Sequence, residues 1–224
     1  MPLPPTRPAP LYPFLTAAVV VLSLVAFFIW QLGFGVDESV QEAGFLPKDW
    51  ASLSPHRREH YVLSTFMHGG IFHVLANMGV LWFFGTRLER LLGPFKFALI
   101  YIIAGYIGLR VHVRMSTQSI APMVGAAGAI SGVLGAWLML HRYEDLDSLW
   151  PDRLPEPLAS WPLWLTAFVW IGLQALSHAI STAHSGGFAA YAELIAGLGA
   201  GAAATYFIKP ERRRGMPATG MEPR

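Results

Sequence analysis

The sequence of 224 residues contains no cysteine and little charge. The absence of cysteine excludes disulfides and thiolate metal sites. Only 13% of the residues are charged, which is about half of the ~25% that is usual in soluble domains. With 54% hydrophobic residues and a mean hydropathy of +0.43, the composition indicates a protein of the lipid bilayer.

The pattern of a cleavable signal peptide is also missing. The first apolar run follows "MPLPPTRPAP", is longer than a signal-peptide core and has no small-residue cleavage site after it. Six segments approach the ~20 apolar residues that a spanning helix needs: 13–34, 64–84, 95–113, 124–140, 161–180 and 188–208. We therefore predict an all-α membrane domain over 13–208, with short tails at 1–12 and 209–224. The second, fourth and sixth segments are rich in small or polar residues and should pack inside the bundle, whereas the first and fifth are bulkier and should face lipid.

The few basic residues predict an orientation. If the N-terminus is cytoplasmic, the other side of the membrane holds only five of the 16 Lys and Arg residues, and the cytoplasmic side holds the remaining eleven; the five are Lys48, Arg57, Arg58, Arg110 and Arg114. This imbalance favours two cytoplasmic termini. We attribute the sequence pI of about 9.0 to topology, and we expect no nucleic-acid partner.

The second segment contains "HGGIFHVLANM", with His68, His73 and Asn77. His73 and Asn77 are four residues apart and share one helix face, so both can donate hydrogen bonds to one point, as an oxyanion hole does. Alternatively, they are buried polar groups that hold helices together. A metal site is disfavoured because the His68–His73 spacing does not stack two ligands and HExxH is absent.

The fourth segment begins with "PMVGAAGAISGVLGAWLML". Its turn, Gly125-Ala126-Ala127-Gly128, has the form that usually presents a reactive side chain, but Ala127 carries only a methyl group. The glycines also suit close packing of helices. Ser131 lies one turn deeper in the helix.

The sixth segment contains "AELIAGLGAGAAATYF", in which small residues repeat every four positions. This pattern predicts a helix that packs closely against another. Glu193 is its single ionisable residue. It is either a functional carboxylate or an interfacial cap that is stabilised by the helix dipole.

Together these pieces resemble the rhomboid family of intramembrane serine proteases. The similarity covers nearly the whole chain: six apolar segments, the long first loop, "HGGIFHVLANM", "LERLLG", "GAAGAISGVLGAW" and the small-residue pattern of the last segment. The resemblance implies a six-helix rhomboid-like bundle without a cofactor. It also implies a Ser-His dyad, with the serine in Gly-x-Ser-Gly on the fourth helix and the histidine on the sixth. His73 and Asn77 match the family's oxyanion pair, and His68 matches a further family histidine.

The chain departs from the family at both dyad positions. Ala127 stands where the nucleophile is expected, between Gly125 and Gly128, and Leu194 or, with a shift of one residue, Glu193 stands at the histidine position. Ser131 and His184 are alternative groups, although a helix built to use His184 would be too long for the last span. A serine attacks only when a base takes its proton.

Two functional interpretations follow. The preferred one is a rhomboid-like pseudoprotease that binds a transmembrane helix of a partner through its lateral face, or serves as a subunit of a larger membrane complex. Trp170 of the fifth segment and Phe84 at the end of the second are the aromatic anchors expected on that face. The alternative is a rhomboid serine endopeptidase seen as an inactivated Ser-to-Ala variant, with His184 as its base. Either would be a multi-pass protein of a bacterial-type inner membrane.

Overall fold

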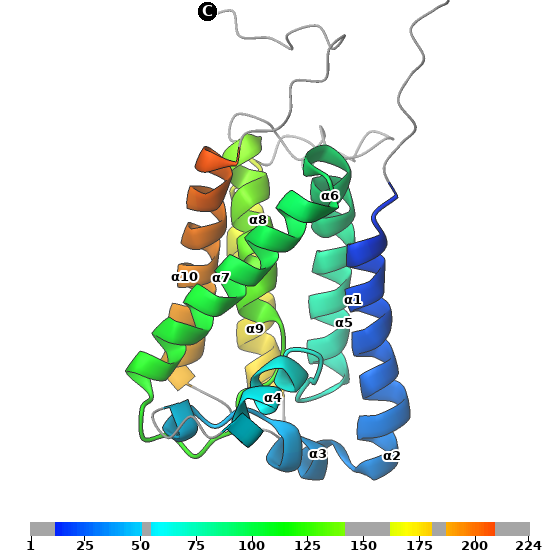
Figure 1. Cartoon of the computed structure of the whole chain (residues 1–224), viewed down its shortest axis with the longest axis vertical. Coiled ribbons are helices and arrows are strands. Elements are labelled where there is room, and N and C mark those ends of the chain that lie inside the picture. The colour runs from blue at the N-terminus through cyan, green and yellow to red at the C-terminus, as the bar shows by residue number, and fades with distance from the viewer. Residues whose placement is uncertain (1–11, 51–54, 142–161, 181–186, 209–224) are drawn as a thin grey trace, which may run out of the picture.

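The computed structural model describes residues 12–50, 55–141, 162–180 and 187–208 (Figure 1). Within these ranges the chain forms helices joined by loops and has no strand, only an isolated bridge between Phe45 and Met123. Residues 1–11 and 209–224 of the two predicted tails lie outside the described residues. The predicted all-α membrane bundle is therefore confirmed.

Every predicted segment corresponds to a helix, although the helices differ in length. By length and apolar composition, four described helices can cross a bilayer: Phe14–Phe34, Ile71–Leu92, α7 (Pro94–Met115) and α10 (Gly187–Phe207). The first consists of α1 (Phe14–Val25), the π-helical turn Ala26–Gln31 and α2 (Leu32–Phe34). The second consists of α5 (Ile71–Val80), the π-helical turn Leu81–Gly85 and α6 (Thr86–Leu92). The other two are α8 (Ala127–Leu140) and α9 (Leu165–Ile180), with 14 and 16 residues. The short α8 begins inside the bundle, where a loop is tolerated because protein surrounds it.

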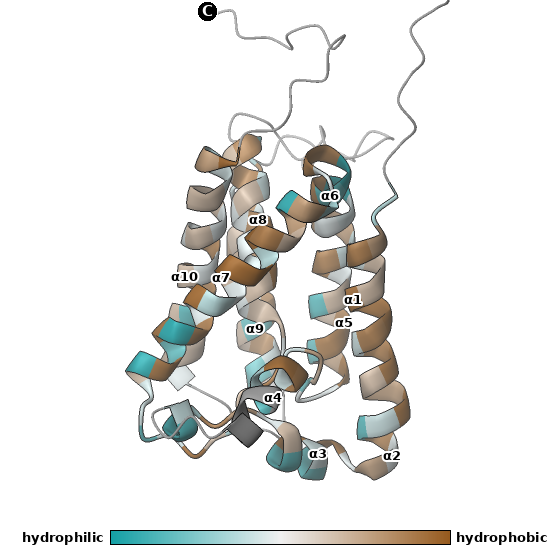
Figure 2. Cartoon of the chain, in the orientation of Figure 1, coloured by the Kyte–Doolittle hydropathy of each residue, from teal (hydrophilic) through white to brown (hydrophobic). Residues whose placement is uncertain are grey.

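Two boundaries differ from the sequence prediction. The second long helix begins at Ile71 and ends at Leu92, several residues later than the predicted 64–84. It continues until Gly93, whose φ of 84° lies in the left-handed region, and Pro94 then opens α7. The segment 35–60, predicted as a polar loop, contains α3 (Val36–Ala43), the 3₁₀ turn Pro47–Trp50 and the start of α4 (Pro55–Ser64). Figure 2 shows hydrophilic residues gathered at α3 and at the lower end of α7, and apolar residues along α1.

A buried carboxylate joins the beginning of α1 to α6. Glu89 is fully buried and accepts hydrogen bonds from the backbone N–H groups of Leu15 and Thr16, at 3.0 and 2.8 Å, and from the Thr16 hydroxyl at 2.7 Å. These N–H groups belong to the first turn of α1, which has no intrahelical partner for them. Glu89 therefore caps α1 from another helix, and the negative charge suits the positive end of the helix dipole.

Glycines bring α8 and α10 into backbone contact. A Cβ atom added at Gly197 would collide with the carbonyl oxygen of Gly128, and one added at Gly201 with the carbonyl oxygen of Gly132. The small-residue contact predicted for the fourth and sixth segments is thus present. Its residues on α10 are Gly197 and Gly201, which are buried, whereas Ala196 is only half-buried.

This contact predicts a position-specific loss of stability. Gly201→Ala should lower the free energy of unfolding by about 1–3 kcal/mol, because the new methyl group forces the two backbones apart. Thermal unfolding in detergent micelles measures the effect.

Gly199→Ala is the matched control, since nothing lies within 4 Å of a Cβ atom at Gly199. That variant should be neutral or slightly more stable, because alanine favours a helix over glycine by about 1 kcal/mol. Equal melting temperatures for the two variants would contradict the contact.

Candidate functional site

A cavity of about 60 Å³ lies beside the beginning of α8. Its wall combines residues of α4, α5, α7, α9 and α10 with the loop 123–126, and it includes His73, His112, Ala127, His178, Glu193 and Leu194. A bound water needs roughly 10–15 Å³ of such space. The cavity therefore has room for water or a small polar group.

The glycine turn forms one wall of this cavity. Gly125 has a φ of 102°, a conformation that residues other than glycine rarely adopt. Its backbone N–H donates a hydrogen bond to the Ser64 carbonyl at 2.8 Å. A Cβ atom at Gly125 would lie 3.1 Å from His73 Nε2 and 3.4 Å from Asn77 Nδ2. The backbone at Gly125 is thus fixed by its conformation and by these two side chains.

His73 and Asn77 are buried in the bundle and direct polar atoms toward the same point. The Gly69 N–H lies 3.4 Å from His73 Nδ1, which accepts from it, so Nε2 carries the ring proton. Asn77 Oδ1 accepts a hydrogen bond from Gln174 Nε2 at 2.8 Å, which leaves its Nδ2 as a donor. Among the described residues neither donor, His73 Nε2 nor Asn77 Nδ2, has a partner. The pair can therefore bind a carbonyl oxygen or an anion.

His68 does not line the cavity but supports His73. Its ring meets that of His73 edge to face with 5.1 Å between centroids, and its backbone N–H donates to Gln31 Oε1 at 2.9 Å. Burial and the nearby His73 hold the pKa of His68 well below its ordinary value, against the opposing effect of its hydrogen bond to the Phe66 carbonyl. His68 is therefore neutral.

The two positions expected to hold the dyad carry apolar side chains. Ala127 is the first residue of α8 and lines the cavity, and Leu194 reaches the same cavity from α10 with 3% of its surface exposed. The alternative Ser131 lies deeper, where its oxygen accepts a hydrogen bond from Trp170 Nε1 at 2.8 Å. His184 lies outside the described residues.

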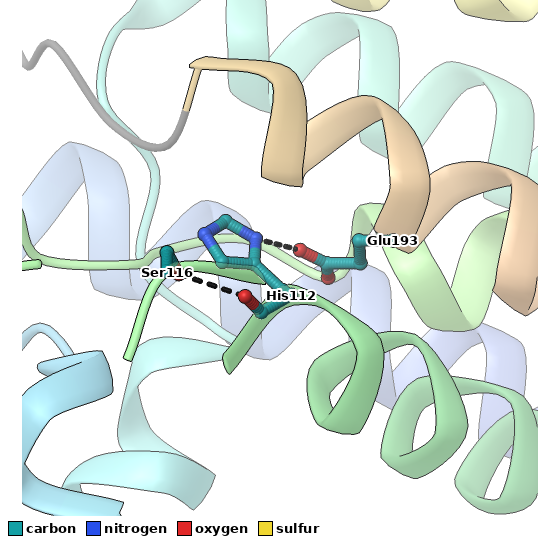
Figure 3. A network of polar contacts seen from close by, with 3 residues as sticks. All are labelled: His112, Ser116 and Glu193. Carbon is teal, nitrogen blue, oxygen red and sulfur yellow. Dashed lines mark hydrogen bonds and ion pairs between the residues drawn. The ribbon is translucent and has the colours of Figure 1, made fainter. Parts of the chain in front are cut away.

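Glu193 lines the cavity beside Leu194 and bonds to α7. His112 Nδ1 lies 2.8 Å from Glu193 Oε2 (Figure 3), and the Ser116 hydroxyl donates to the His112 carbonyl at 2.7 Å. The other carboxylate oxygen would lie 2.9 Å from a Cβ atom at Gly128. The interpretation of Glu193 as a cap of its own helix is wrong, because the first turn of α10 contains no acidic residue.

Sequence analysis missed two imidazoles of this site. His112 comes from α7 and His178 from α9, with its ring centroid 6.2 Å from that of His73. The available signal was the presence of a histidine within each apolar run, since ionisable residues in spanning helices usually face the bundle interior. Despite these side chains, the described residues contain no group of three or more His, Asp or Glu that could hold a metal ion.

Comparison with known proteins gives a consistent result. A model described as "Rhomboid domain" matches residues 56–211. RHOMBOID-like protein 1 of Arabidopsis thaliana is 34% identical over 61% of this chain and 34% of its own length. The presenilin-associated rhomboid-like protein of Rattus norvegicus mitochondria is 43% identical over 34% of the chain and 20% of its own length. Rhomboid protease GluP of Bacillus subtilis is 31% identical over 56% of this chain and 24% of its own length.

The chain thus spans about a third or less of the length of these curated relatives. The family model nevertheless covers the four-helix arrangement of α5, α7, α8 and α10 and every side chain that lines the cavity. On this match, the chain belongs to the rhomboid family.

Proposed function

We propose that this chain is a multi-pass membrane protein that binds a transmembrane segment of a partner and has no serine-protease activity. The observation that carries the proposal is the pair of apolar side chains, Ala127 and Leu194, that line the cavity at the two positions of the family's dyad. A covalent mechanism needs a hydroxyl that is hydrogen-bonded to a base.

Other hydroxyls near the cavity do not meet this requirement. Ser64 Oγ donates to the Tyr61 carbonyl at 2.9 Å and Thr65 Oγ1 to the Val62 carbonyl at 2.6 Å. Ser131 is paired with Trp170. Within the described ranges, no hydroxyl that lines the cavity is bonded to an imidazole, which supports a non-covalent role.

The lateral face remains available for a partner, with different anchors from those expected. Trp170 and Phe84 were expected to face outward on the binding surface, but Trp170 is 1% and Phe84 7% exposed. Their large rings turn inward because they fill the core, where Trp170 also meets Ser131. Two of the exposed aromatic residues are Trp82, next to α5, and Phe168 on α9, at 53% and 63%. These two helices are neighbours through the Gln174–Asn77 hydrogen bond, so both rings suit a helical partner.

Serine endopeptidase activity is the alternative. It is favoured by the similarity to a protein named Rhomboid protease GluP, and it requires that Ala127 replaces a native serine. The excess of basic residues on one side of the predicted topology supports cytoplasmic termini, and the membrane we propose is a bacterial-type inner membrane.

The purified chain should not react covalently with a fluorophosphonate probe, and it should not cleave a transmembrane substrate whose helix is destabilised. Both reactions need a nucleophilic hydroxyl, which the cavity lacks. GluP from Bacillus subtilis, treated identically, is the positive control. Labelling of the chain above the level of a heat-denatured sample would contradict the proposal.

Site-specific photo-crosslinking tests the lateral face. A photoreactive amino acid at Phe168 or Trp82 should capture one defined transmembrane protein in native membranes. The same residue at Ile102 of α7, which is 64% exposed, should capture only lipid. Lipid adducts alone from all three positions would contradict helix binding.

The absence of cysteine makes the orientation directly measurable. Cysteine introduced at Gln118, in the loop before α8, should react with an impermeant maleimide in spheroplasts. Cysteine at Arg90, in the last turns of α6, should react only after permeabilisation. The reverse pattern would place the termini outside.

A further inference from the structure

The cavity contains a carboxylate–imidazole pair that the binding of a partner helix does not explain. Glu193 and His112 are 81 residues apart and come from α10 and α7. A carboxylate can only accept a hydrogen bond, so His112 Nδ1 carries a proton and donates it to Glu193 Oε2 at 2.8 Å. In the neutral imidazole, His112 Nε2 is then the acceptor nitrogen of the ring.

That nitrogen is buried and has no partner among the described protein groups. His112 is 3% exposed and lines the cavity, and its Nε2 has no hydrogen-bond partner among the described residues. A buried polar atom without a partner is costly unless water or a ligand satisfies it. Imidazole oriented by a carboxylate through Nδ1, with Nε2 free, is the arrangement of a general base.

The opposite requirement is met on the α5 side of the same cavity. His73 Nε2 and Asn77 Nδ2 are both donors, both lack partners among the described residues, and both lie near Gly125. Two converging donors suit an oxygen that gains negative charge. His73 lines the cavity and Asn77 adds a second donor beside Gly125, so the site offers donors for a carbonyl oxygen and an acceptor for a proton.

Gly108 shows that these parts are close together. A Cβ atom at Gly108 would lie 3.1 Å from the Glu193 Cγ atom and 3.4 Å from the Gly128 Cα atom. His112 is one helical turn beyond Gly108 on α7, and Gly128 follows Ala127 directly. Glu193 thus lies against the beginning of α8, and its partner His112 lines the same cavity as Ala127, whose methyl group leaves space for a water molecule.

We propose that His112, positioned by Glu193, activates a water molecule in this cavity for hydrolysis of a carboxylic ester. Water oxygen attacks the acyl carbon, one water proton passes to His112 Nε2, and the carbonyl oxygen becomes an oxyanion held by His73 and Asn77. The C–O bond to the alcohol then breaks, and the leaving oxygen takes the proton from His112. The products are the carboxylic acid and the alcohol, and the base is regenerated.

The substrate class follows from the environment and from the missing nucleophile. The cavity has room for the small polar group of an ester, and its wall carries apolar side chains such as Leu109 and Met123, which favour an apolar acyl chain. Esters are more reactive than amides, and water without covalent catalysis is a weaker reagent than an activated serine. This activity goes beyond partner binding and does not depend on it.

The experiment uses the full chain in detergent micelles with 4-nitrophenyl butyrate and follows release of 4-nitrophenolate. The parent should exceed the buffer rate and should be insensitive to a fluorophosphonate, which excludes a serine hydrolase contaminant. His112→Gln should lower kcat about 10²-fold or more, as expected for loss of a general base. Glu193→Gln should lower kcat with little change in KM, since Glu193 orients the base and does not touch the ester.

His141→Gln is the matched control, because His141 lies just beyond α8, stacked on Trp137 with 4.0 Å between ring centroids, and is absent from the cavity wall. Its activity should equal that of the parent. The cavity wall also contains the titratable side chains His73, His178 and Tyr61. Loss of activity in His112→Gln therefore identifies His112 as the general base.

Two results overturn the proposal: a parent rate equal to buffer, or a His112→Gln variant as active as the parent. If His112→Gln fails to fold, judged by thermal unfolding, the Glu193→Gln variant decides. Its kcat must then fall while KM changes little, and a kcat equal to that of the parent rejects a base oriented by Glu193. If ester hydrolysis is absent while photo-crosslinking still captures a partner, this inference fails and the proposed function stands.

Discussion

The contact between the backbones of α8 and α10 is the constraint on which the site depends. In a bilayer, helices do not associate by the hydrophobic effect, so close approach of small residues supplies much of the packing energy. The paired glycines, Gly128 with Gly197 and Gly132 with Gly201, bring the two backbones together. The same register directs Leu194 into the cavity and carries Glu193 to the space between Gly108 and Gly128. If the two helices were farther apart, neither Leu194 nor Glu193 would keep its position at the cavity.

The second constraint is the satisfaction of polar groups where water is scarce. Most buried polar side chains in the described part of the chain have a clear structural partner. Glu89 caps α1, and Gln31 donates to the His68 carbonyl and accepts from the His68 N–H, both at 2.9 Å. Around the cavity the rule is broken, because five side chains each leave one atom without a partner among the described residues: His73, Asn77, His112, Gln174 and His178. Since such atoms are costly, their concentration at one cavity marks the place where the molecule binds something polar.

Sequence patterns predicted those features that depend on composition or on neighbours along one helix. Length and hydropathy located the six helical segments, and the four-residue spacing put His73 and Asn77 on one face. The His112–Glu193 pair could not be derived in this way, because it joins two helices 81 residues apart. The direction of Trp170 was also predicted wrongly. Hydropathy records that a ring is apolar but does not distinguish lipid from a protein core that offers Ser131 as a partner for the indole N–H. The end of the second helix was missed because the sequence after Phe84 resembles a charged loop that begins at a glycine, whereas the helix continues through Gly85 and ends at Leu92, before Gly93.

The glycine turn explains how the architecture is compatible with a methyl group at its centre. Gly125 is fixed by its φ of 102° and by two donors that leave no room for a side chain. Gly128 is fixed by the backbone of α10 and by the Glu193 carboxylate. Ala127 between them is only half-buried, and none of these contacts depends on the identity of its side chain. The turn therefore keeps its shape whether or not residue 127 carries a hydroxyl. A serine or an alanine at residue 127 is therefore compatible with the same fold. With alanine there, a water molecule beside the methyl group can act as the nucleophile.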